Sequence, residues 1–425
     1  MKYKILNLGC PKNLVDGEIL AGVLSSDSSH ISIPDGSLII NTCSFIASAR
    51  AEAISEIRNA VSMKRRGEIS KVYVTGCMVK SHIDEIKSID GIDGIIEPVF
   101  TWERLFERAE LFHNRILASN PRTAYVRIAD GCNKRCSYCL IPTIRGRYRS
   151  RKMDDIIDEV NGLSKRDVNE IVLISEDVGS YGSDIYGEFA LPRLLTNIDK
   201  ISEIKWIRLL YLNPQSLTNE LLEVMKSSDK VLHYFDIPLQ HTSSKILTAM
   251  GRSPLSMPYS KWLSNIYDIL PDAVIRITFM VGFPSETEDE FYSLLMDIEL
   301  NPPDHLTVFI YSKERNTIAG EMPSQINDEI KLERYNKLLG LYYRLGIEKK
   351  RQRFVGKIEE VILEDIDVNL PYSLGIGSIG RLWFQAPDID GKIFLPDYKI
   401  GKVGEIINVL VDGVRGYDFI GSVII

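Results

Sequence analysis

The first third of the chain repeats one pattern of apolar and polar positions three times. Residues 3–8, 37–40 and 72–75 are short apolar runs, each bounded by turn residues, which is typical of buried strands. Each run is followed by a segment with helical spacing, as in residues 46–57, where apolar residues recur every three or four positions. Strands that alternate with helices predict an α/β domain, a doubly wound parallel sheet with helices on its faces.

A cysteine stands directly after each of these runs, at positions 10, 43 and 77. In parallel sheets of this kind the ligand site lies beyond the carboxyl ends of the strands, so Cys10, Cys43 and Cys77 can converge although more than thirty residues separate each from the next. Three unrelated buried cysteines are the alternative, but those can fall anywhere in a strand or helix. We therefore predict a metal site made of three thiolates.

The alternation resumes on a larger scale between residues 123 and 347. Strands are expected at 123–129, 170–175, 205–211, 231–237, 273–281 and 306–311. Six strand–helix units predict a partial (β/α)6 barrel, with catalytic groups at the carboxyl ends of its strands.

The last part of the chain, from about residue 352, has short strands and turns and predicts a small β-barrel. Strands are expected at 358–363, 381–386, 392–395, 404–410 and 414–423. Residues 375–380 formally match a dinucleotide-binding glycine pattern, but that pattern needs a strand before it and a helix after it. Here a strand follows, so we expect a flexible β-turn. The expected domains are 1–120, 121–350 and 351–425.

Composition restricts the class of protein. The chain has 425 residues, 44% of them hydrophobic and 26% charged, which is typical of a globular protein with several domains. No apolar run approaches the roughly 20 residues that span a membrane, and the start does not resemble a signal peptide. We expect a cytoplasmic protein, monomeric by default and without a membrane partner. In that compartment its six cysteines should be reduced. The net charge of −7 argues against a large nucleic-acid interface.

The strongest local signal is the motif formed by Cys132, Cys136 and Cys139, directly after the first strand of the expected barrel. Three thiolates in one tight loop can hold three irons of a four-iron cluster, and without a fourth cysteine nearby the fourth iron keeps an open position. Structural zinc is the alternative. It requires four closed ligands, commonly in CxxC pairs, and none of the six histidines stands at a matching spacing beside this loop.

CxxxCxxC after the first strand of a partial barrel resembles the radical S-adenosylmethionine superfamily. The three-cysteine amino-terminal domain and the carboxy-terminal barrel resemble the methylthiotransferases, whose terminal barrel is a TRAM domain. The resemblance covers essentially the whole chain and all six cysteines. It implies two [4Fe-4S] clusters, S-adenosylmethionine and an external electron donor. It further implies that the cluster on Cys132, Cys136 and Cys139 cleaves S-adenosylmethionine, and that the second cluster presents the inserted sulfur.

Two further segments resemble parts of this family that face S-adenosylmethionine. Residues 234–241, which read YFDIPLQH, look like a cofactor-facing strand end, and residues 276–291 look like the family's glycine-bearing turn. The resemblance implies Gln240, Arg276 and Gly282 as cofactor contacts.

Three positions depart from the family pattern. Glu176 stands where a glutamine is common, Asn213 where a histidine is common, and Thr242 where a small residue is usual. These departures concern the surroundings of the site and leave the reaction class unchanged.

The substrate is indicated by residues 9–16, which read GCPKNLVD and resemble the type that modifies an aspartate β-carbon in protein twelve of the small ribosomal subunit. The transfer-RNA type usually has Gln and Met in place of Pro11 and Lys12. Residues 351–425 carry eight Lys and Arg and eleven Asp and Glu, and an acidic barrel suits a basic ribosomal protein better than RNA. We expect the aspartate methylthiotransferase. A transfer-RNA adenosine methylthiotransferase and an iron–sulfur electron carrier are the alternatives.

The arginines of residues 145–151 directly follow the cluster motif. We expect them to line the rim of the active site and meet an acidic target side chain. A solvated surface stretch is the alternative.

Overall fold

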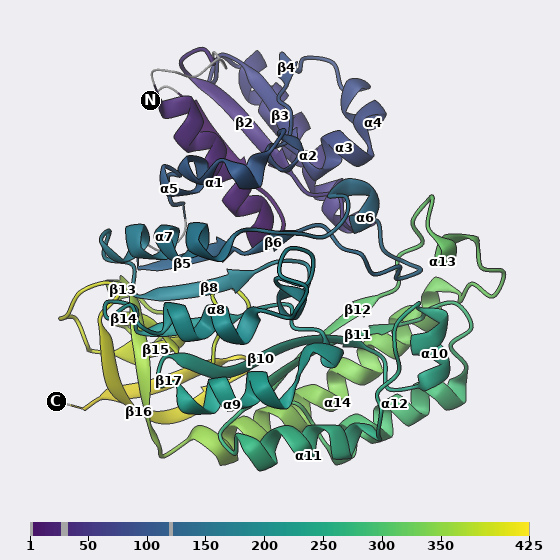
Figure 1. The fold of residues 1–425 in the computed structure, drawn as a ribbon, viewed down its shortest axis with the longest axis vertical. Helices are drawn as coiled ribbons and strands as arrows, with labels where there is room; N and C mark the ends of the chain where they lie inside the picture. Colours follow the sequence, from purple (N-terminus) through teal and green to yellow (C-terminus); the bar gives the residue numbers. More distant parts are fainter. Residues whose placement is uncertain (1–2, 27–32, 119–121, 425) are drawn as a thin grey trace.

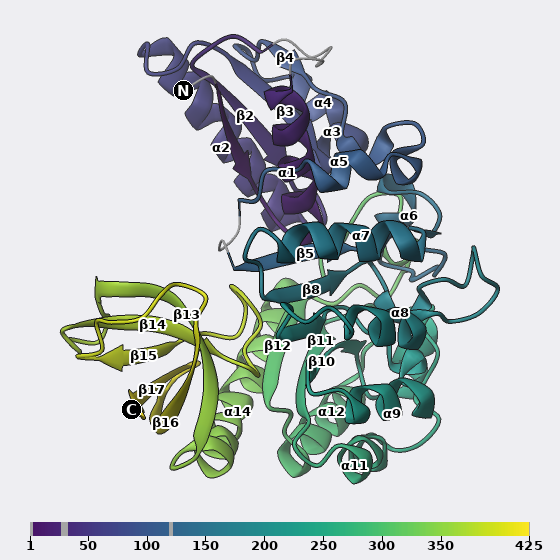
Figure 2. The ribbon, with the colours of Figure 1, turned by 60° about the vertical axis from the view of Figure 1, so that its left-hand side comes forward.

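A computed structural model describes residues 3–26, 33–118 and 122–424. Figures 1 and 2 show an amino-terminal sheet at the top, a central sheet with its helices below it, and the carboxy-terminal barrel at the lower left. The amino-terminal sheet has four parallel strands in the order β1 (Tyr3–Asn7), β2 (Ser37–Thr42), β3 (Val72–Gly76) and β4 (Gly94–Ile95).

The two long helices of this part, α1 (Pro11–Ser25) and α2 (Ala47–Arg65), cover opposite faces of the sheet. Ile39 packs in one core with Val15 of α1, whereas its neighbour Ile40 packs in another core with Ile57 of α2. Consecutive strand residues point to opposite faces, so this division confirms helices on both sides of the parallel sheet. The short elements that complete this part are α3 (Cys77–Ser81), α4 (Ile83–Lys87), η1 (Val99–Thr101), η2 (Leu105–Glu107) and α5 (Ala109–His113).

The central sheet has six parallel strands in the order β12, β11, β10, β9, β8, β5 and forms the predicted partial barrel. Their bounds are β5 (Thr123–Arg127), β8 (Glu170–Ile174), β9 (Trp206–Leu209), β10 (Val231–Gln240), β11 (Val274–Val281) and β12 (His305–Ile310). Five longer helices follow these strands: α7 (Met153–Ser164), α8 (Leu191–Ile198), α9 (Asn219–Ser227), α11 (Tyr259–Ile269) and α12 (Glu288–Leu300). Their apolar faces and the strands share one buried core.

Shorter elements connect the strands at the carboxyl end of the barrel. They are β6 (Ala129–Asp130), α6 (Ile141–Ile144), β7 (Arg149–Ser150), η3 (Val178–Ser180), η4 (Pro214–Ser216), α10 (Ser244–Ala249) and α13 (Ile318–Glu321). The long helix α14 (Asp328–Phe354) then packs along β12 and leads to the last domain. In the described part of the chain, no helix is long and apolar enough to cross a membrane.

The carboxy-terminal strands close into the predicted small barrel, in the order β13, β14, β15, β17, β16. Their bounds are β13 (Ile358–Asn369), β14 (Ile376–Leu382), β15 (Ile393–Pro396), β16 (Ile406–Arg415) and β17 (Asp418–Val423). The expected flexible turn at 375–380 is wrong, because residues from Ile376 onward belong to β14. Gly377 is required there by close packing, since a Cβ would lie 2.2 Å from the Leu395 carbonyl oxygen. The single strand expected at 414–423 is a hairpin that turns at Gly416.

The central barrel has a different neighbour at each end. At the amino ends of its strands, Arg381 of β14 pairs with Glu170, the first residue of β8. At the carboxyl ends, Arg50 of α2 pairs with Glu314, just beyond β12, at 2.5 Å. The amino-terminal sheet therefore meets the end of the barrel where catalytic groups are expected, and the carboxy-terminal barrel meets the opposite end.

Candidate active site

The three amino-terminal cysteines lie at the carboxyl edge of the first sheet. Cys10 directly precedes α1, Cys43 follows β2, and Cys77 begins α3 after β3. Gly9 has φ +84°, and a Cβ on it would lie 2.7 Å from the Cys43 sulfur, so only glycine lets these segments approach. Burial, with smaller contributions from the nearby Cys10 and Cys43, raises the pKa of the Cys77 thiol to about 12, although Arg145 opposes this rise. The fold therefore brings the three thiols within electrostatic reach of one another.

Arg145 connects this triad to the central barrel. Its Nη2 lies 3.7 Å from the Cys77 sulfur and 2.9 Å from Asp16 Oδ2 on α1, while its Nη1 lies 3.2 Å from Asp130 Oδ1. Arg151 is equally buried and pairs with Glu159 at 2.5 Å. The expectation that the whole arginine run lines the rim is thus wrong for these two residues, because buried carboxylates hold them.

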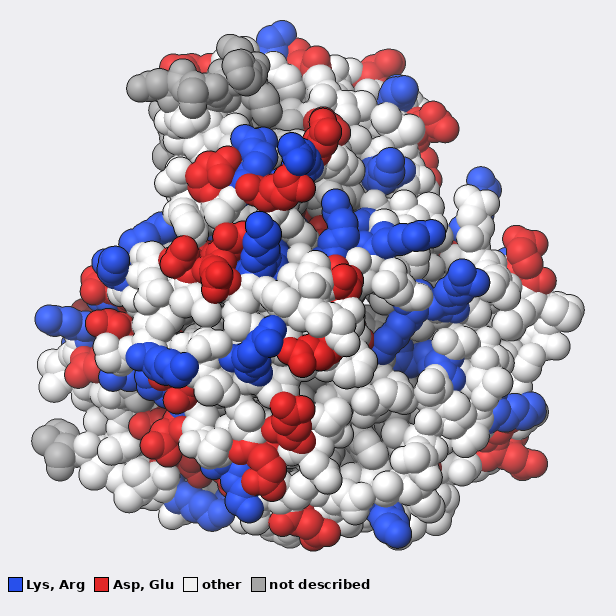
Figure 3. Space-filling view, viewed as in Figure 1, with Lys and Arg blue, Asp and Glu red and all other residues white. Residues whose placement is uncertain are grey.

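Other residues of this run do reach the surface. Arg147 and Arg149 are exposed. In Figure 3, Lys and Arg side chains gather right of centre, around the place where Figure 1 labels α6. A basic surface therefore lies near the central cysteine loop, although the chain as a whole is acidic.

The central cysteines lie in the loop between β6 and α6, and donors surround their sulfurs. The Lys134 and Ile141 backbone N–H groups each donate to a sulfur at 3.4 Å, those of Cys132 and Cys139 respectively. The Arg252 guanidinium lies 3.7 Å from the Cys136 sulfur. Donors of this kind stabilise thiolate charge and tune the reduction potential of a cluster.

Both triads consist of thiols, which are the protein ligands of iron–sulfur clusters, and in a cluster each thiolate binds a different iron. Across residues 3–26, 33–118 and 122–424, no three Cys, His, Asp or Glu side chains are placed to hold one metal ion. Burial raises the pKa of Cys139 to about 12, and a bound cation would reverse this effect by stabilising the thiolate.

Of the three predicted cofactor contacts, two lie close together. Gln240 ends β10, adjacent to β11, and Gly282 directly follows β11. Gln240 has φ +77° and Gly282 has φ +74°, and the Gly282 N–H donates to Glu286. Arg276 lies six residues before Gly282, deeper in the barrel, where its Nη1 donates to Asp390 of the last domain at 2.9 Å. Its role in cofactor binding stays a prediction.

Buried polar atoms without a hydrogen-bond partner gather at the carboxyl ends of the barrel strands. Both carboxylate oxygens of Glu176, after β8, lack a hydrogen bond, as do Gln240 Oε1 and Thr242 Oγ1 after β10 and the Tyr311 hydroxyl after β12. Burial raises the pKa of Glu176 to about 7. Such groups mark a place where a ligand can supply the missing partners. Asn213 instead has a local role, since its side chain caps η4 by accepting from Gln215 N–H.

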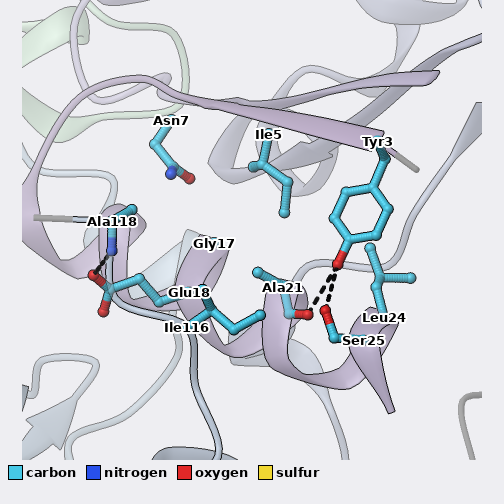
Figure 4. A pocket seen from close by; sticks show the side chains of 10 residues that line it. All are labelled: Tyr3, Ile5, Asn7, Gly17, Glu18, Ala21, Leu24, Ser25, Ile116 and Ala118. Atoms are coloured by element: carbon cyan, nitrogen blue, oxygen red, sulfur yellow. Dashed lines mark hydrogen bonds between the residues drawn. The ribbon is translucent and has the colours of Figure 1, made fainter. Parts of the chain in front are cut away.

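A pocket of about 490 Å³ lies away from the cysteines, between β1 and α1 (Figure 4). Tyr3, Ile5 and Leu24 contribute to its lining, and the Tyr3 hydroxyl donates to the Ala21 carbonyl at 3.0 Å. It has no thiol in its lining, so it does not belong to the candidate active site.

Comparisons with known proteins agree with this architecture. Residues 126–298 match the radical SAM superfamily, residues 2–97 match the uncharacterized protein family UPF0004, and residues 355–424 match the TRAM domain. A solved structure of the radical S-adenosylmethionine methyltransferase TsrM from Kitasatospora setae aligns with TM-score 0.51 over 75% of this chain and 77% of that one, at 12% identity. This likeness concerns the fold.

Curated relatives cover the full length. The ribosomal protein uS12 methylthiotransferase RimO of Clostridium botulinum (strain Okra) is 37% identical, over 100% of this chain and 98% of the relative. The proteins of the same name from Clostridioides difficile and Acetivibrio thermocellus are 34% and 36% identical, again over all of this chain and over 99% and 98% of the relatives. The chain belongs to this methylthiotransferase family. Membership in the radical SAM superfamily implies S-adenosylmethionine and iron–sulfur chemistry, as predicted from the cysteine motif.

Sequence reasoning alone does not identify two residues of the candidate site, Arg252 and Lys12. Arg252 was not identified because nothing in its local sequence indicates that it reaches a sulfur of the distant cluster loop. Lys12 was noted only as part of a motif, and its position against Tyr211 and Glu176 depends on how two domains pack.

Proposed function

We propose that this protein transfers a methylthio group to the β-carbon of an aspartate in protein twelve of the small ribosomal subunit. The observation that carries the proposal is the full-length similarity to proteins named for that activity, at 34–37% identity. The arrangement of two cysteine triads around the carboxyl end of one barrel supports it, because the reaction needs hydrogen abstraction and sulfur transfer at one carbon atom.

We further propose two [4Fe-4S] clusters, one on Cys132, Cys136 and Cys139 and one on Cys10, Cys43 and Cys77. Together with S-adenosylmethionine, they would supply a radical able to remove a hydrogen atom that ordinary acids and bases cannot remove, and the sulfur to be inserted. The chain's own contribution is to bury the thiols, to donate to them from backbone N–H groups, and to place Arg145 and Arg252 beside their sulfurs.

The remaining assignments follow from the same proposal. Gln240, Gly282 and Arg276 would contact S-adenosylmethionine, and an external donor would supply electrons. We divide the chain into 1–120 with the second cluster, 121–350 with the cleavage site, and 351–425 for substrate recognition, supported by the excess of acidic residues in the last part. A monomer that acts in the cytoplasm, where ribosomal proteins are made and assembled, fits this role.

The test is a modification assay with two acceptors. The protein is reconstituted with iron and sulfide without oxygen, supplied with reductant and S-adenosylmethionine, and offered protein twelve and unmodified transfer RNA in separate reactions. Mass spectrometry then detects a methylthio group. We expect modification of one aspartate in the protein. Modification of the RNA alone would contradict the proposal, and the Cys132→Ala variant is the control that should release no 5′-deoxyadenosine.

A further inference from the structure

We propose that Lys12 binds the carboxylate of the substrate aspartate and thereby selects an acidic acceptor side chain. This inference rests on the proposed function and names the group that recognises its substrate.

Lys12 reaches from the amino-terminal domain into the mouth of the central barrel. It is the second residue of α1 and follows Cys10 by two positions. Its Nζ lies 3.4 Å from the Ser175 carbonyl oxygen, beyond β8, and 4.1 Å from the centre of the Tyr211 ring, beyond β9. The side chain is only 9% exposed. A buried ammonium is thus placed where the carboxyl ends of two barrel strands meet the segment that carries Cys10.

This ammonium is only loosely paired. The carboxylate it approaches is Glu176, at 3.9 Å, and neither oxygen of Glu176 has a hydrogen-bond partner. Arg127, by contrast, meets Asp16 at 2.5 Å. Because a buried charge is costly unless it is closely paired, an incoming carboxylate on Lys12 would complete an interaction that the protein leaves incomplete.

A chain of contacts holds Tyr211, the residue whose ring lies under the Lys12 ammonium. Tyr211 has φ +65°, and its backbone N–H donates to Asp236 Oδ2 at 3.0 Å. Asp236 accepts from Arg276 at 3.2 Å, and Arg276 donates to Asp390 at 2.9 Å. The ring on which the ammonium rests is therefore held in position before substrate arrives, which lowers the cost of ordering the site on binding.

The position of Lys12 also suits the carbon atom that reacts, which is the β-carbon of the substrate aspartate. Lys12 follows Cys10 by two positions on the chain. It faces Glu176, two residues beyond the end of β8, and Tyr211, two residues beyond the end of β9. In aspartate the β-carbon is bonded directly to the carboxylate carbon. Holding that carboxylate on Lys12 would fix the β-carbon at the carboxyl ends of the barrel strands, beside the segment that carries Cys10, where both steps must reach it.

S-adenosylmethionine also carries a carboxylate, so the two sources must be distinguished. We assign the carboxylate at Lys12 to the substrate because Lys12 lies at the ends of β8 and β9, on the segment of Cys10. Two of the three residues expected to contact S-adenosylmethionine, Gln240 and Gly282, lie at the ends of β10 and β11, and the third, Arg276, lies deeper in β11, where Asp236 and Asp390 hold it.

The test compares peptides within each protein variant. Fluorescent peptides that contain the target residue as Asp or as Asn are titrated into the reconstituted enzyme without reductant, and anisotropy gives both Kd values. We expect the wild type to favour the Asp peptide by about tenfold or more, the range of a charge-assisted contact. Lys12→Met should bind both peptides alike, and Lys12→Arg should keep most of the preference. Lys64→Met, which removes a lysine paired with Asp93 far from the site, is the matched control.

The ratio of the two Kd values does not depend on the fraction of folded protein. The result therefore stays clear even if part of the Lys12→Met variant is unfolded. Retained preference for Asp in Lys12→Met would overturn the inference. So would a fall in affinity for S-adenosylmethionine with an unchanged peptide ratio. A wild-type enzyme without any preference would overturn it as well. Failure of the proposed function is separate, because it would appear as the absence of modified protein twelve in the mass-spectrometric assay.

Discussion

Individual residues with unusual backbone angles occur where the site is assembled. Tyr211 and Gln240 have positive φ although they carry side chains, and each lies at or just beyond the end of a barrel strand. Gly9, with φ +84°, permits the contact between the Cys10 turn and Cys43. Strained conformations of this kind persist only where the surrounding structure holds them, and they concentrate at functional sites.

Gly9→Ala should remove the proposed cluster on Cys10, Cys43 and Cys77. The added methyl group would lie 2.7 Å from the Cys43 sulfur, so the Cys10 turn would move and the amino-terminal triad would no longer close around iron. We expect the iron bound per chain after reconstitution to fall by about half. The visible absorbance of the iron–sulfur clusters should fall with it. Gly67→Ala has a similar φ of +76° but nothing within 4 Å, so it should lose only about 1 kcal/mol of stability and keep its iron. Equal iron in the two variants would contradict this account.

At the scale of secondary-structure elements, apolar runs were sufficient to predict the six strands of the central sheet, because buried parallel strands need apolar residues on both faces. They were not sufficient for β14, where glycines replace large side chains to allow close packing against β15 and β13. The chemistry of the cysteines could be predicted because it depends on short spacings. The contact of Arg276 with Asp390 could not, since 114 residues separate the pair.

Asp93 shows how one side chain joins several elements. It accepts from Lys64 of α2, from Lys71, and from the Val72 N–H that begins β3. Burial alone would raise its pKa, but these three donors lower the pKa to about 2. Because the pKa is lower when folded, Asp93 stabilises the protein above about pH 4, and this contribution is lost as the pH falls toward 2.

Asp93→Asn should therefore lower the free energy of unfolding by about 1 kcal/mol at pH 7, the scale of a partly solvated network. Urea titrations at several pH values measure the difference between wild type and variant. We expect it to shrink as the pH falls from 4 toward 2, since the wild-type carboxylate is then protonated too. A difference that does not depend on pH would contradict the electrostatic explanation.

At the scale of the whole molecule, the carboxy-terminal barrel closes the amino ends of the central strands. Asp390 extends into the central barrel, where it accepts from Arg276 at 2.9 Å and from the Tyr234 hydroxyl at 2.5 Å. Burial would raise its pKa, but His305 and Arg276 lower the pKa to about 2. Arg208 adds a second contact by donating to the Trp383 carbonyl at 2.7 Å. The last domain is thus joined to the catalytic domain through buried charges.

Asp390→Asn should destabilise the protein by about 3 kcal/mol, because Arg276 would stay buried with Asp236 but without its closer anionic partner. Tryptophan fluorescence during urea unfolding can measure this, since Trp206 of the central barrel and Trp383 of the last domain both lie at the interface between the two. Asp397→Asn, at an exposed turn of the same domain, should change stability by less than about 0.5 kcal/mol. Equal effects of the two substitutions would show that the buried pair of Arg276 and Asp390 contributes no more to stability than an exposed carboxylate does.

The buried position of Asp390 also sets a condition for exchanging domains between relatives. A last domain grafted from another family member would transfer its outer surface, and any substrate preference it confers, only if it brought a carboxylate to the same point as Asp390 and a cation to that of Arg381. Without them, the recipient's Arg276 would keep only Asp236 as an anionic partner, and its Glu170 would lose a cation inside the barrel and keep Arg208. Chimeric proteins joined at the end of α14, a boundary chosen from sequence alone, should therefore be unstable unless these two positions are matched.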